Sequence, residues 1–338
     1  MFNNKSILIT GGTGSFGSKF VEQVLKNFKP KRLIIFSRDE LKQSLMAQKF
    51  SKEKYGCIRY FIGDVRDLSR LTQAMKGVDY VVHAAALKQV ILAEYNPMEC
   101  VKTNIGGAEN VVKAAIDTNV FRVIGLSSDK ASDPINLYGA TKLTAEKIFI
   151  SANNIVGGDP NRTRFSVARY GNVVGSRGSV VPIFKELLDQ GVKELPITDE
   201  KMTRFCITLD QAVDFVIKSF GRMVGGEMFI PKIPSIKIID LAKAMAPKSN
   251  YRVIGIRPGE KIHEKMCSIH EARLTLDFED YYVIEPAINF WDHSPDYSKN
   301  ALHETGKPVS EEFEYRSDNN ENFLNVEQIK NLIASQIR

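Results

Sequence analysis

The amino-acid sequence predicts an α/β protein built on a doubly wound parallel sheet, and two observations predict it. Short β-branched runs alternate with amphipathic stretches over the first 170 residues, as in chains that form parallel sheets. A glycine-rich segment, ITGGTGSFG, follows the first of these runs and opens the first helical stretch. This order is typical of a Rossmann-like domain, where such glycines form the turn between the first strand and the first helix.

The elements are expected in strict alternation. Strands are predicted at Ser6–Thr10, Arg32–Ser37, Cys57–Ile62, Tyr80–His83, Arg122–Ser127 and Arg164–Ala168. Helices are predicted between them at Phe16–Lys26, Arg38–Phe50, Leu68–Met75, Thr103–Asp117 and Tyr138–Asn153. Further along, the pattern predicts helices at Val181–Gln190, Thr208–Phe220, Ile238–Ala246 and Val326–Ile337, with strands at Met228–Ile230 and Val253–Ile256.

The length predicts a second module. A chain of 338 residues, 43% hydrophobic, exceeds the roughly 150–200 residues that a Rossmann domain needs. We therefore expect a Rossmann domain in residues 1–170, to which 205–232 return. A smaller C-terminal substrate-binding lobe is expected from residues 171–204 and 233–338.

Charge and cysteine usage narrow the class of protein. The net charge of +6 suits a phosphate-bearing substrate, although ordinary solubility charge explains it equally simply, and no run of like charges suits nucleic acid. Cys57, Cys100, Cys206 and Cys267 are scattered, as reduced structural thiols are. The start, MFNNKSILIT, leads directly into a strand, and no stretch of 18 apolar residues occurs. These features predict a cytoplasmic protein that does not contact a membrane.

The glycine-rich turn predicts a dinucleotide site. Gly11, Gly14 and Gly17 permit a positive φ in the turn, close backbone approach to a pyrophosphate, and tight packing of helix on strand. The N-terminus of the following helix supplies unpaired N–H groups for the phosphates.

The end of the second strand favours NADP over NAD. An NAD site usually has an acidic residue here for the ribose 2′-hydroxyl, whereas this chain has Ser37 and Arg38, with Lys42 one turn further on. These side chains can bind a 2′-phosphate, the alternative being an ordinary solvated helix start. The full set of expected cofactor contacts is Gly11, Thr13, Gly14, Ser15, Phe16, Gly17, Ser37, Arg38, Lys42, Asp64, Val65, Ala84, Ala85, Ala86, Lys88, Asn104, Tyr138 and Lys142.

A tyrosine and a lysine follow the fifth strand at helical spacing. Tyr138 and Lys142 stand at i and i+4, so both side chains face the same way, and Ser128 ends the strand before them. An ammonium beside a phenol is expected to lower the pKa of the phenol towards neutrality. Tyr138 would then act as the base that takes a hydroxyl proton while a hydride leaves the same carbon.

The motifs together carry a resemblance. ITGGTGSFG, SRDELKQ, GDVRD, HAAALKQV, AEYNP, SSDKASDPINLYGATK, ARYGNVVGSRGSV and MTRF resemble the extended short-chain dehydrogenase/reductases. Within them the chain most resembles the inverting UDP-N-acetylglucosamine 4,6-dehydratases of pseudaminic acid biosynthesis, the route that supplies flagellin glycosylation. Two departures are Ser128 in place of threonine and Ile91 in place of proline.

The resemblance implies a hydro-lyase that uses NADP as an internal redox partner. Tyr138, Lys142 and Ser128 would oxidise the sugar 4-hydroxyl, Lys130 would remove the C5 proton, and Asp129 would protonate the departing 6-hydroxyl. Lys130 must be neutral to act as a base, and burial with a nearby Lys88 or Lys142 charge is expected to depress its pKa. From the residues alone, Asp129 and Lys130 are equally well explained as a surface ion pair.

The resemblance also implies the substrate side of the site. It places Lys88, Asn172, Val180, Thr198, Arg204, Arg257 and Glu260 around the UDP-sugar, with inter-lobe salt bridges as the alternative for the arginines. Glu94 and Tyr95 would shape the sugar end. His263 and His270 flank Cys267 without metal-site spacing, so no metal is expected.

Two other functions stay open at this point. One is a UDP-sugar 4- or 5-epimerase on the same scaffold, and the other is a non-catalytic NADP-binding sensor. The family resemblance further suggests a homo-oligomer, from dimer to hexamer.

Overall fold

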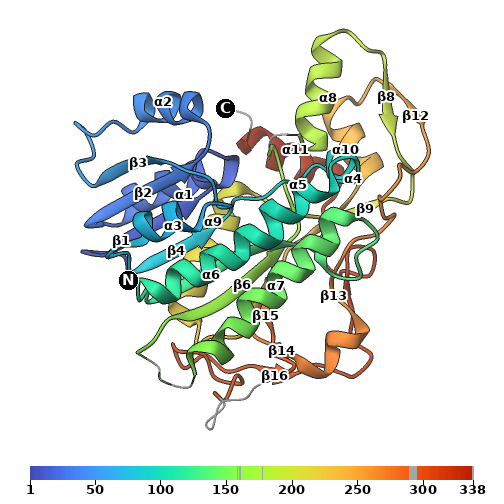
Figure 1. Ribbon diagram of the computed structural model, residues 1–338. Helices are drawn as coiled ribbons and strands as arrows, with labels where there is room; N and C mark the ends of the chain where they lie inside the picture. The colour runs from blue at the N-terminus through green and yellow to red at the C-terminus, as the bar shows by residue number, and fades with distance from the viewer. Residues whose placement is uncertain (158, 160, 177, 289–294, 337–338) are drawn as a thin grey trace.

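The computed structural model describes residues 1–157, 159, 161–176, 178–288 and 295–336, and it confirms the Rossmann-like α/β fold (Figure 1). Among these residues the main sheet has ten strands in the order β16-β14-β15-β10-β6-β5-β4-β1-β2-β3. Their bounds are β1 Ser6–Thr10, β2 Arg32–Ser37, β3 Ile58–Ile62, β4 Tyr80–His83, β5 Arg122–Ser128, β6 Arg164–Tyr170, β10 Met228–Pro231, β14 Thr275–Asp277, β15 Tyr281–Ile284 and β16 Lys307–Pro308. The strands from β3 to β10 pair in parallel, so their carboxyl ends meet at one edge.

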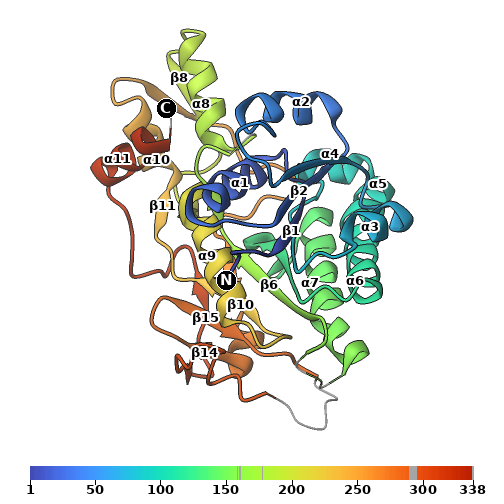
Figure 2. The same cartoon turned by 90° about the vertical axis from the view of Figure 1, so that its left-hand side faces the viewer.

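Helices cover both faces of the sheet. Helices α3, α6 and α7 pack together on one face, and α1 packs against α9 on the other (Figure 2). The helices of this domain are α1 Ser15–Asn27, α2 Glu40–Lys49, α3 Leu68–Met75, α4 Val90–Tyr95, α5 Pro97–Val101, α6 Gly107–Asp117, α7 Leu137–Val156 and α9 Leu209–Arg222. A π-helical segment, η1 Lys102–Gly106, joins α5 to α6, and a 3₁₀ turn, η2 Asp129–Ala131, follows β5.

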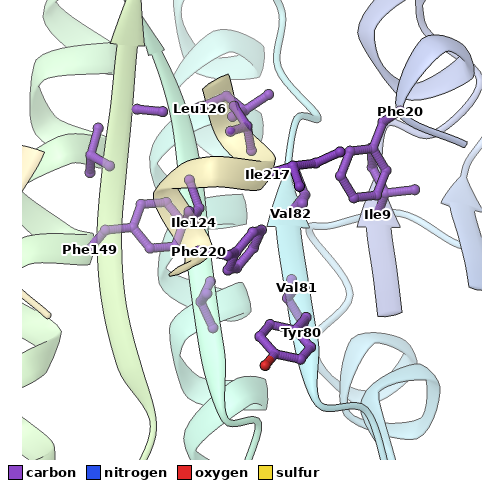
Figure 3. Packing of buried hydrophobic residues seen from close by; sticks show 14 of the residues in the cluster. Ile9, Phe20, Tyr80, Val81, Val82, Ile124, Leu126, Phe149, Ile217 and Phe220 are labelled. Carbon is purple, nitrogen blue, oxygen red and sulfur yellow. The ribbon is translucent and has the colours of Figure 1, made fainter. Parts of the chain in front are cut away.

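The core lies between the sheet and these helices. Ile217 and Phe220 of α9 pack over the central strands near Val82 of β4 and Ile124 of β5 (Figure 3). All of these side chains are at most 8% exposed. Strands of a parallel sheet are buried on both faces and are therefore almost continuously apolar. This is why the sequence predicts the alternation of strands and helices.

The C-terminal lobe has a smaller core of its own. It is built from α8 Val180–Asp189, β8 Glu194–Ile197, β12 Asn250–Val253, β7 Asn172–Val173, β9 Thr203–Ile207, β11 Ser235–Lys237, α10 Ile238–Met245 and α11 Val326–Gln336. Strand β8 pairs with β12, and β9 lies between β7 and β11. Two further strands, β13 Lys265–Cys267 and β17 Tyr315–Arg316, and the 3₁₀ helix η3 Ile269–Leu274 connect the lobe to the main sheet. Leu195, Ile197, Leu241 and Ile329 form the centre of this core.

Several elements differ from the sequence prediction. The strand expected at Val253–Ile256 is wrong in position, because β12 ends at Val253 and the apolar side chains after it are exposed. Strands β15, β14 and β16 extend the main sheet beyond β10 through successive antiparallel pairs, although the sequence prediction places that segment in the lobe. Helices α4 and α5 were not foreseen, and the expected helix end at Ile337 lies outside the described residues. The short antiparallel strands at the edge of the sheet were missed because they contain too few residues to show an alternation of apolar and polar side chains.

Within the described residues, no helix is long and apolar enough to cross a membrane. The same part of the chain holds no cluster of three His, Cys, Asp or Glu side chains suited to a metal ion.

A buried ion-pair cluster links the two halves of the molecule. The guanidinium of Arg169 on β6 donates to both carboxylate oxygens of Glu146 on α7, at 2.9 and 2.8 Å. It also donates to the Met266 carbonyl at 2.8 Å and to Glu271 of η3 at 3.0 Å. The Arg169 side chain is fully buried, so every donor is matched within the protein.

Removing this guanidinium is expected to destabilise the fold. We expect Arg169→Met to lower the free energy of unfolding by about 3–5 kcal/mol, because Glu146 and Glu271 would lose their counter-charge in a buried site. Urea denaturation followed by circular dichroism measures the change. The matched control is Arg162→Met, whose exposed pair with Asp159 spans 3.9 Å and should contribute less than about 1 kcal/mol. Equal effects of the two variants would contradict the assigned role of Arg169.

Candidate active site

The glycine-rich turn opens one end of a deep cleft at the carboxyl edge of the parallel strands. Gly11 has a φ of 65°, and a Cβ there would lie 2.9 Å from the backbone of Ala85. A Cβ on Gly17 would meet the backbone of Gly12 at 2.5 Å, so only glycine lets α1 begin this close to β1. The cleft encloses about 560 Å³. Its size and its glycine floor suit a ligand with a diphosphate backbone.

The residues predicted to bind the cofactor gather in this cleft, with two exceptions. Lining it are Gly11, Thr13, Gly14, Ser15, Phe16, Gly17, Ser37, Arg38, Lys42, Val65, Ala84, Ala85, Ala86, Lys88, Tyr138 and Lys142. Asp64 lies outside the lining and accepts hydrogen bonds from Arg66 at 2.7 and 2.9 Å. Asn104 is buried and bridges the Leu87 backbone and the Thr141 hydroxyl, which makes it a support of the cleft wall in this structure.

The end of β2 presents two cations at the rim. Arg38 lies 3.6 Å from Asp64, and Lys42 lies 2.7 Å from Asp39, with both cations about half exposed. The Ser37 hydroxyl accepts a hydrogen bond from Gln43 at 3.0 Å. Because these ion pairs are exposed, an arriving phosphate can recruit Arg38 and Lys42 at small cost.

The polar groups expected to do chemistry meet further along the cleft. Ser128 ends β5, Asp129 and Lys130 form η2, and Tyr138 stands in the first turn of α7. Ser128 donates to Asp129 Oδ1 at 2.7 Å, and Lys130 Nζ donates to the same oxygen at 3.0 Å. Asp129 is 1% exposed. The alternative of an ion pair on the outer surface is not supported, because Asp129 is buried and the Lys130 side chain, 24% exposed, lines the cleft.

Close packing of α7 on η2 brings these groups together. Asn136 caps α7 by accepting a hydrogen bond from the Gly139 amide at 2.7 Å. A Cβ on Gly139 would collide with the carbonyl oxygen of Lys130, so a glycine after Tyr138 is what lets the helix start against η2. The YGATK segment therefore supplies both a phenol and the space that the phenol needs.

The pKa of Tyr138 runs against the sequence prediction. Burial raises the pKa of Tyr138 to about 12, and the opposing charge is that of Lys130. Burial lowers the pKa of Lys142 to about 8, and its ammonium donates to the Leu126 carbonyl. The expected lowering of the phenol pKa by Lys142 is thus wrong for this structure, because desolvation of the phenolate outweighs the nearby positive charge.

The pKa of Lys130 is also shifted the other way. Burial alone would lower it, but the charges of Asp129 and Glu264 more than compensate and raise the pKa well above its ordinary value. The expected depression by other lysines is wrong, since Lys130 instead pushes down the pKa of Lys88, which burial already lowers. Burial and the Glu264 charge raise the pKa of Asp129.

Glu264 is a residue at the site that sequence reasoning missed. Its Oε1 lies 3.2 Å from Lys130 Nζ, and its side chain is 3% exposed. It precedes β13, 134 positions after Lys130 in the chain (264 − 130), with no motif around it. Tyr170, Thr103 and Ser127 also line the cleft unforeseen, and the hydroxyls of Thr103 and Ser127 are buried with no hydrogen-bond partner in the described structure.

The residues predicted for the substrate divide into two groups. Lys88 and Asn172 line the cleft, and Asn172 Oδ1 accepts from Lys130 at 3.4 Å. The others, Val180, Thr198, Arg204, Arg257 and Glu260, lie in the C-terminal lobe outside the lining. Arg204 donates to the carbonyls of Thr203, Ile262 and Lys261, so its guanidinium is largely occupied. The substrate roles of these residues stay predictions.

Three other predicted positions have structural explanations. Glu94 accepts a hydrogen bond from the Leu137 amide at 2.7 Å and so caps α7, while Tyr95 is 86% exposed. His83 is buried in β4 against the Thr10 hydroxyl at 2.9 Å, and burial lowers its pKa to about 3. His83 is therefore a packed strand residue.

Comparisons with known proteins agree with this geometry. A family model described as "Polysaccharide biosynthesis protein" matches residues 7–286. The chain is 57% identical over 333 residues to the inverting UDP-N-acetylglucosamine 4,6-dehydratase of Campylobacter jejuni subsp. jejuni serotype O:2, with 98% of each chain covered. It is 43% identical over 342 residues to the UDP-glucose 4-epimerase of Rickettsia massiliae, covering 99% of this chain and 97% of that one.

Solved structures share the fold. Pen from Bacillus thuringiensis superposes with a TM-score of 0.87 at 38% identity, covering 99% of this chain and 98% of that chain. The dTDP-glucose 4,6-dehydratase DesIV from Streptomyces venezuelae superposes with a TM-score of 0.67 at 21% identity over 76% of this chain and 86% of that one, a likeness of fold alone.

Replacing Lys130 is expected to make stability depend on pH. In Lys130→Met, Asp129 and Glu264 would face each other without the ammonium, so their folded-state pKa values should rise above the unfolded values of about 4. A carboxyl group whose pKa is higher in the folded state than in the unfolded state stabilises the fold at pH values below that pKa. This stabilisation is lost as the pH rises. The melting temperature should therefore fall further below that of the parent protein at about pH 8 than at about pH 5. Lys130→Arg keeps the charge and should show little of this dependence, whereas parallel pH curves for all three proteins would refute the prediction.

Proposed function

The chain belongs to the polysaccharide biosynthesis protein family, within the extended short-chain dehydrogenases/reductases, and from that premise we propose that it is an NADP-dependent, C5-inverting UDP-N-acetylglucosamine 4,6-dehydratase. The reaction is a hydro-lyase reaction. The sugar is oxidised at C4, loses water across C5 and C6, and is reduced at C6, giving a UDP-2-acetamido-2,6-dideoxy-L-arabino-hexos-4-ulose.

One observation carries the proposal: a buried acid and a partly buried amine stand side by side in the cleft that also holds Tyr138. Asp129 and Lys130 share a 3.0 Å hydrogen bond and line the same cavity as the glycine-rich turn. A simple oxidoreductase needs the tyrosine and the cofactor but has no use for an additional buried acid–base pair. An elimination needs both, since one proton leaves C5 and another must reach the departing oxygen.

The cleft fits a nicotinamide dinucleotide. The glycine cradle at Gly11 and Gly17 would be filled by any Cβ, and the amino end of α1 supplies N–H groups for a diphosphate. The unpartnered buried hydroxyls of Thr103 and Ser127 offer hydrogen bonds to a polar ligand. When bound, the oxidised cofactor accepts the hydride from C4 and later returns it to C6, so it is not consumed.

We propose NADP as the form used. Ser37 places no carboxylate where a 2′-phosphate would lie, and Arg38 and Lys42 supply two cations at the rim. Asp39 at the same rim is already neutralised by Lys42 and caps α2 through the Lys42 amide.

Tyr138 is the proposed base for the 4-hydroxyl proton. Its pKa of about 12 in the buried site makes the phenolate a strong base once formed. The Lys130 charge favours the phenolate, and Lys130 lines the same cleft as the phenol. Lys142, held by the Leu126 carbonyl at the end of β5, supplies a second titratable amine at the same wall.

Lys130 and Asp129 are the proposed base and acid of the elimination. Lys130 must be neutral to take the C5 proton, and Asp129 must be protonated to give one to the leaving hydroxyl. The ion pair reaches that form when one proton moves from Nζ to Oδ1 along the 3.0 Å hydrogen bond. The raised pKa of buried Asp129 favours this transfer and the raised pKa of Lys130 opposes it, so the ion pair is the resting form.

An epimerase is the second candidate, favoured by the 43% identity to the UDP-glucose 4-epimerase of Rickettsia massiliae. A 4-epimerase would use Tyr138 and the cofactor without removing the C5 proton. The pathway expectations, pseudaminic acid and flagellin glycosylation, stay predictions, as do the cytoplasmic location and the homo-oligomeric state.

Proton NMR of the protein with UDP-N-acetylglucosamine in D2O tests the function. The dehydratase should produce a new C6 methyl signal, deuterium at C5 and a 4-keto sugar of L configuration. A product that keeps its C6 hydroxymethyl group and is inverted at C4 would replace the dehydratase proposal with the epimerase.

The control for this experiment is Tyr138→Phe, which also separates an enzyme from a cofactor sensor. We expect turnover to fall by about 10³-fold, because the phenolate is lost, while cofactor binding changes little. A variant that retained the activity of the parent protein would contradict the role given to Tyr138.

Changing the end of β2 should change the cofactor preference. Ser37→Asp would place a carboxylate beside the 2′-phosphate, so NADP should bind about tenfold or more weakly while NAD binding is kept or improved. Fluorescence titration with both cofactors measures the ratio. Ser37→Ala is the matched control, since it removes the hydroxyl without adding charge. An unchanged ratio in Ser37→Asp would place the phosphate elsewhere.

A further inference from the structure

Glu264 contacts the proposed base from behind, outside the cleft. Its Oε1 lies 3.2 Å from Lys130 Nζ, yet Glu264 itself is absent from the lining of the cavity that Lys130 faces. The Glu264 side chain is 3% exposed and that of Lys130 24%, so water screens this contact less than it would a surface pair. Glu264 therefore acts on the substrate only through Lys130.

The backbone around Glu264 is fixed by three hydrogen bonds. The Glu264 amide donates to the Ser317 hydroxyl at 2.9 Å, and the Ser317 amide donates to the Glu264 carbonyl at 2.8 Å. The Ser317 hydroxyl also pairs with that of Thr203 on β9 at 2.7 Å. Because these hydrogen bonds fix the Glu264 backbone, its carboxylate has little freedom to follow the Lys130 amine. The carboxylate therefore fixes the position of the amine.

The carboxylate is poorly satisfied by anything except cations. Arg204 Nε lies 3.8 Å from Oε1, and Oε2 is buried with no hydrogen-bond partner in the described structure. Oδ2 of Asp129 is buried and unpartnered as well. Buried oxygens without partners are costly, so this arrangement is not the one that maximal stability would select.

Charged and titratable groups surround Lys130 on every side. They are Asp129 beside it, Glu264 before β13, Arg204 on β9, Lys88 after β4, Lys261 in the lobe and Tyr138 on α7. Asp129 and Glu264 are the two whose charges favour the ammonium, and both contact its nitrogen.

We propose that Glu264 is a positioning residue for the elimination step, holding the Lys130 amine against the cleft and stabilising the proton that Lys130 takes from C5. This inference rests on the proposed dehydratase function. It assigns to the reaction a residue from the C-terminal lobe, so that the base is completed only when the two halves of the chain are packed together.

The proton balance shows where Glu264 acts. The C5–H bond breaks, its proton goes to Lys130 Nζ, and its electron pair forms the C5–C6 double bond. The C6–O bond breaks, and the oxygen leaves as water with the proton of Asp129. The pair is then Lys130 ammonium and Asp129 carboxylate, which is the ion pair that the structure contains. Glu264 stabilises this state, and the proton on Lys130 returns to Asp129 before the next turnover. Reduction at C6 leaves an enolate whose C5 takes up one proton, which balances the proton that Tyr138 receives from the 4-hydroxyl and releases.

The test is the pH profile of turnover in Glu264→Gln. Removing a negative charge lowers the pKa of every group near it, so both limbs of the bell-shaped profile should move to lower pH by about one unit or more. Turnover at the optimum should fall about tenfold or more, since the amine loses a fixed partner. A purely structural role would reduce turnover equally at all pH values and leave the limbs in place, and that result would overturn the proposal.

A single-turnover measurement locates the affected step. Oxidation at C4 does not use Lys130 as its base, so absorbance of reduced nicotinamide should appear at the parental rate and then persist in Glu264→Gln. Disappearance of that signal at the parental rate would also overturn the proposal. If the parent protein forms no C6 methyl product, it is the dehydratase function that fails, so the two failures are distinguishable.

Two further variants complete the design. Glu264→Asp keeps the negative charge but moves it away from Lys130. Turnover should fall while the two limbs of the pH profile stay near those of the parent protein. This variant tests the proposal if Glu264→Gln does not fold. Glu314→Gln removes the neighbouring carboxylate that pairs with Lys265 at 2.5 Å, and it should leave the pH profile unchanged. A shifted profile in Glu314→Gln would show that the effect is general rather than a property of Glu264.

Discussion

One partly buried ammonium held between two buried carboxylates is the interaction on which the site depends. A lone Lys130 in this interior would lose its proton, and a lone Asp129 would keep one, because each charge is costly without water. Together with Glu264 they remain ionised at distances of 3.0 and 3.2 Å. The cluster sits at the edge of the sheet where β5 ends, so a polar group that would be unstable elsewhere is supported by the packing around it.

Hydrogen bonds across the domain boundary keep that cluster assembled. The turn between β5 and α7 is joined to the lobe by Asn136, which donates to the Gly259 carbonyl at 2.7 Å, and by Lys261, which donates to the Ser132 carbonyl at 2.7 Å. Arg169 adds a buried tie between β6, α7 and η3. The turn between β5 and α7 carries Asp129 and Lys130. These contacts fix its position relative to Glu264.

The walls of the cleft depend on a different constraint, which is the lack of room for side chains at three glycines. Gly11, Gly17 and Gly139 each stand where a Cβ would meet a backbone atom at 2.9 Å or closer. Close approach of helices to strand ends leaves room for a ligand while the helix termini still point into the cleft. A scaffold of this kind is compatible with more than one reaction, and the side chains after β5 decide which one it performs.

The sequence by itself determined the parallel sheet, the cofactor turn and the segment that carries Ser128, Asp129, Lys130 and Tyr138. These features are local, because a buried parallel strand, a glycine turn and an i, i+4 pair each leave a pattern within a few residues. Only the tertiary structure decided the charge state of the pair. Glu264 stands in no motif and reaches Lys130 through the fold, and together with buried Asp129, whose charge has the larger effect, it reverses the expected pKa shift of that lysine. Electrostatic energy depends on distance and burial, neither of which is a property of neighbouring positions in a chain.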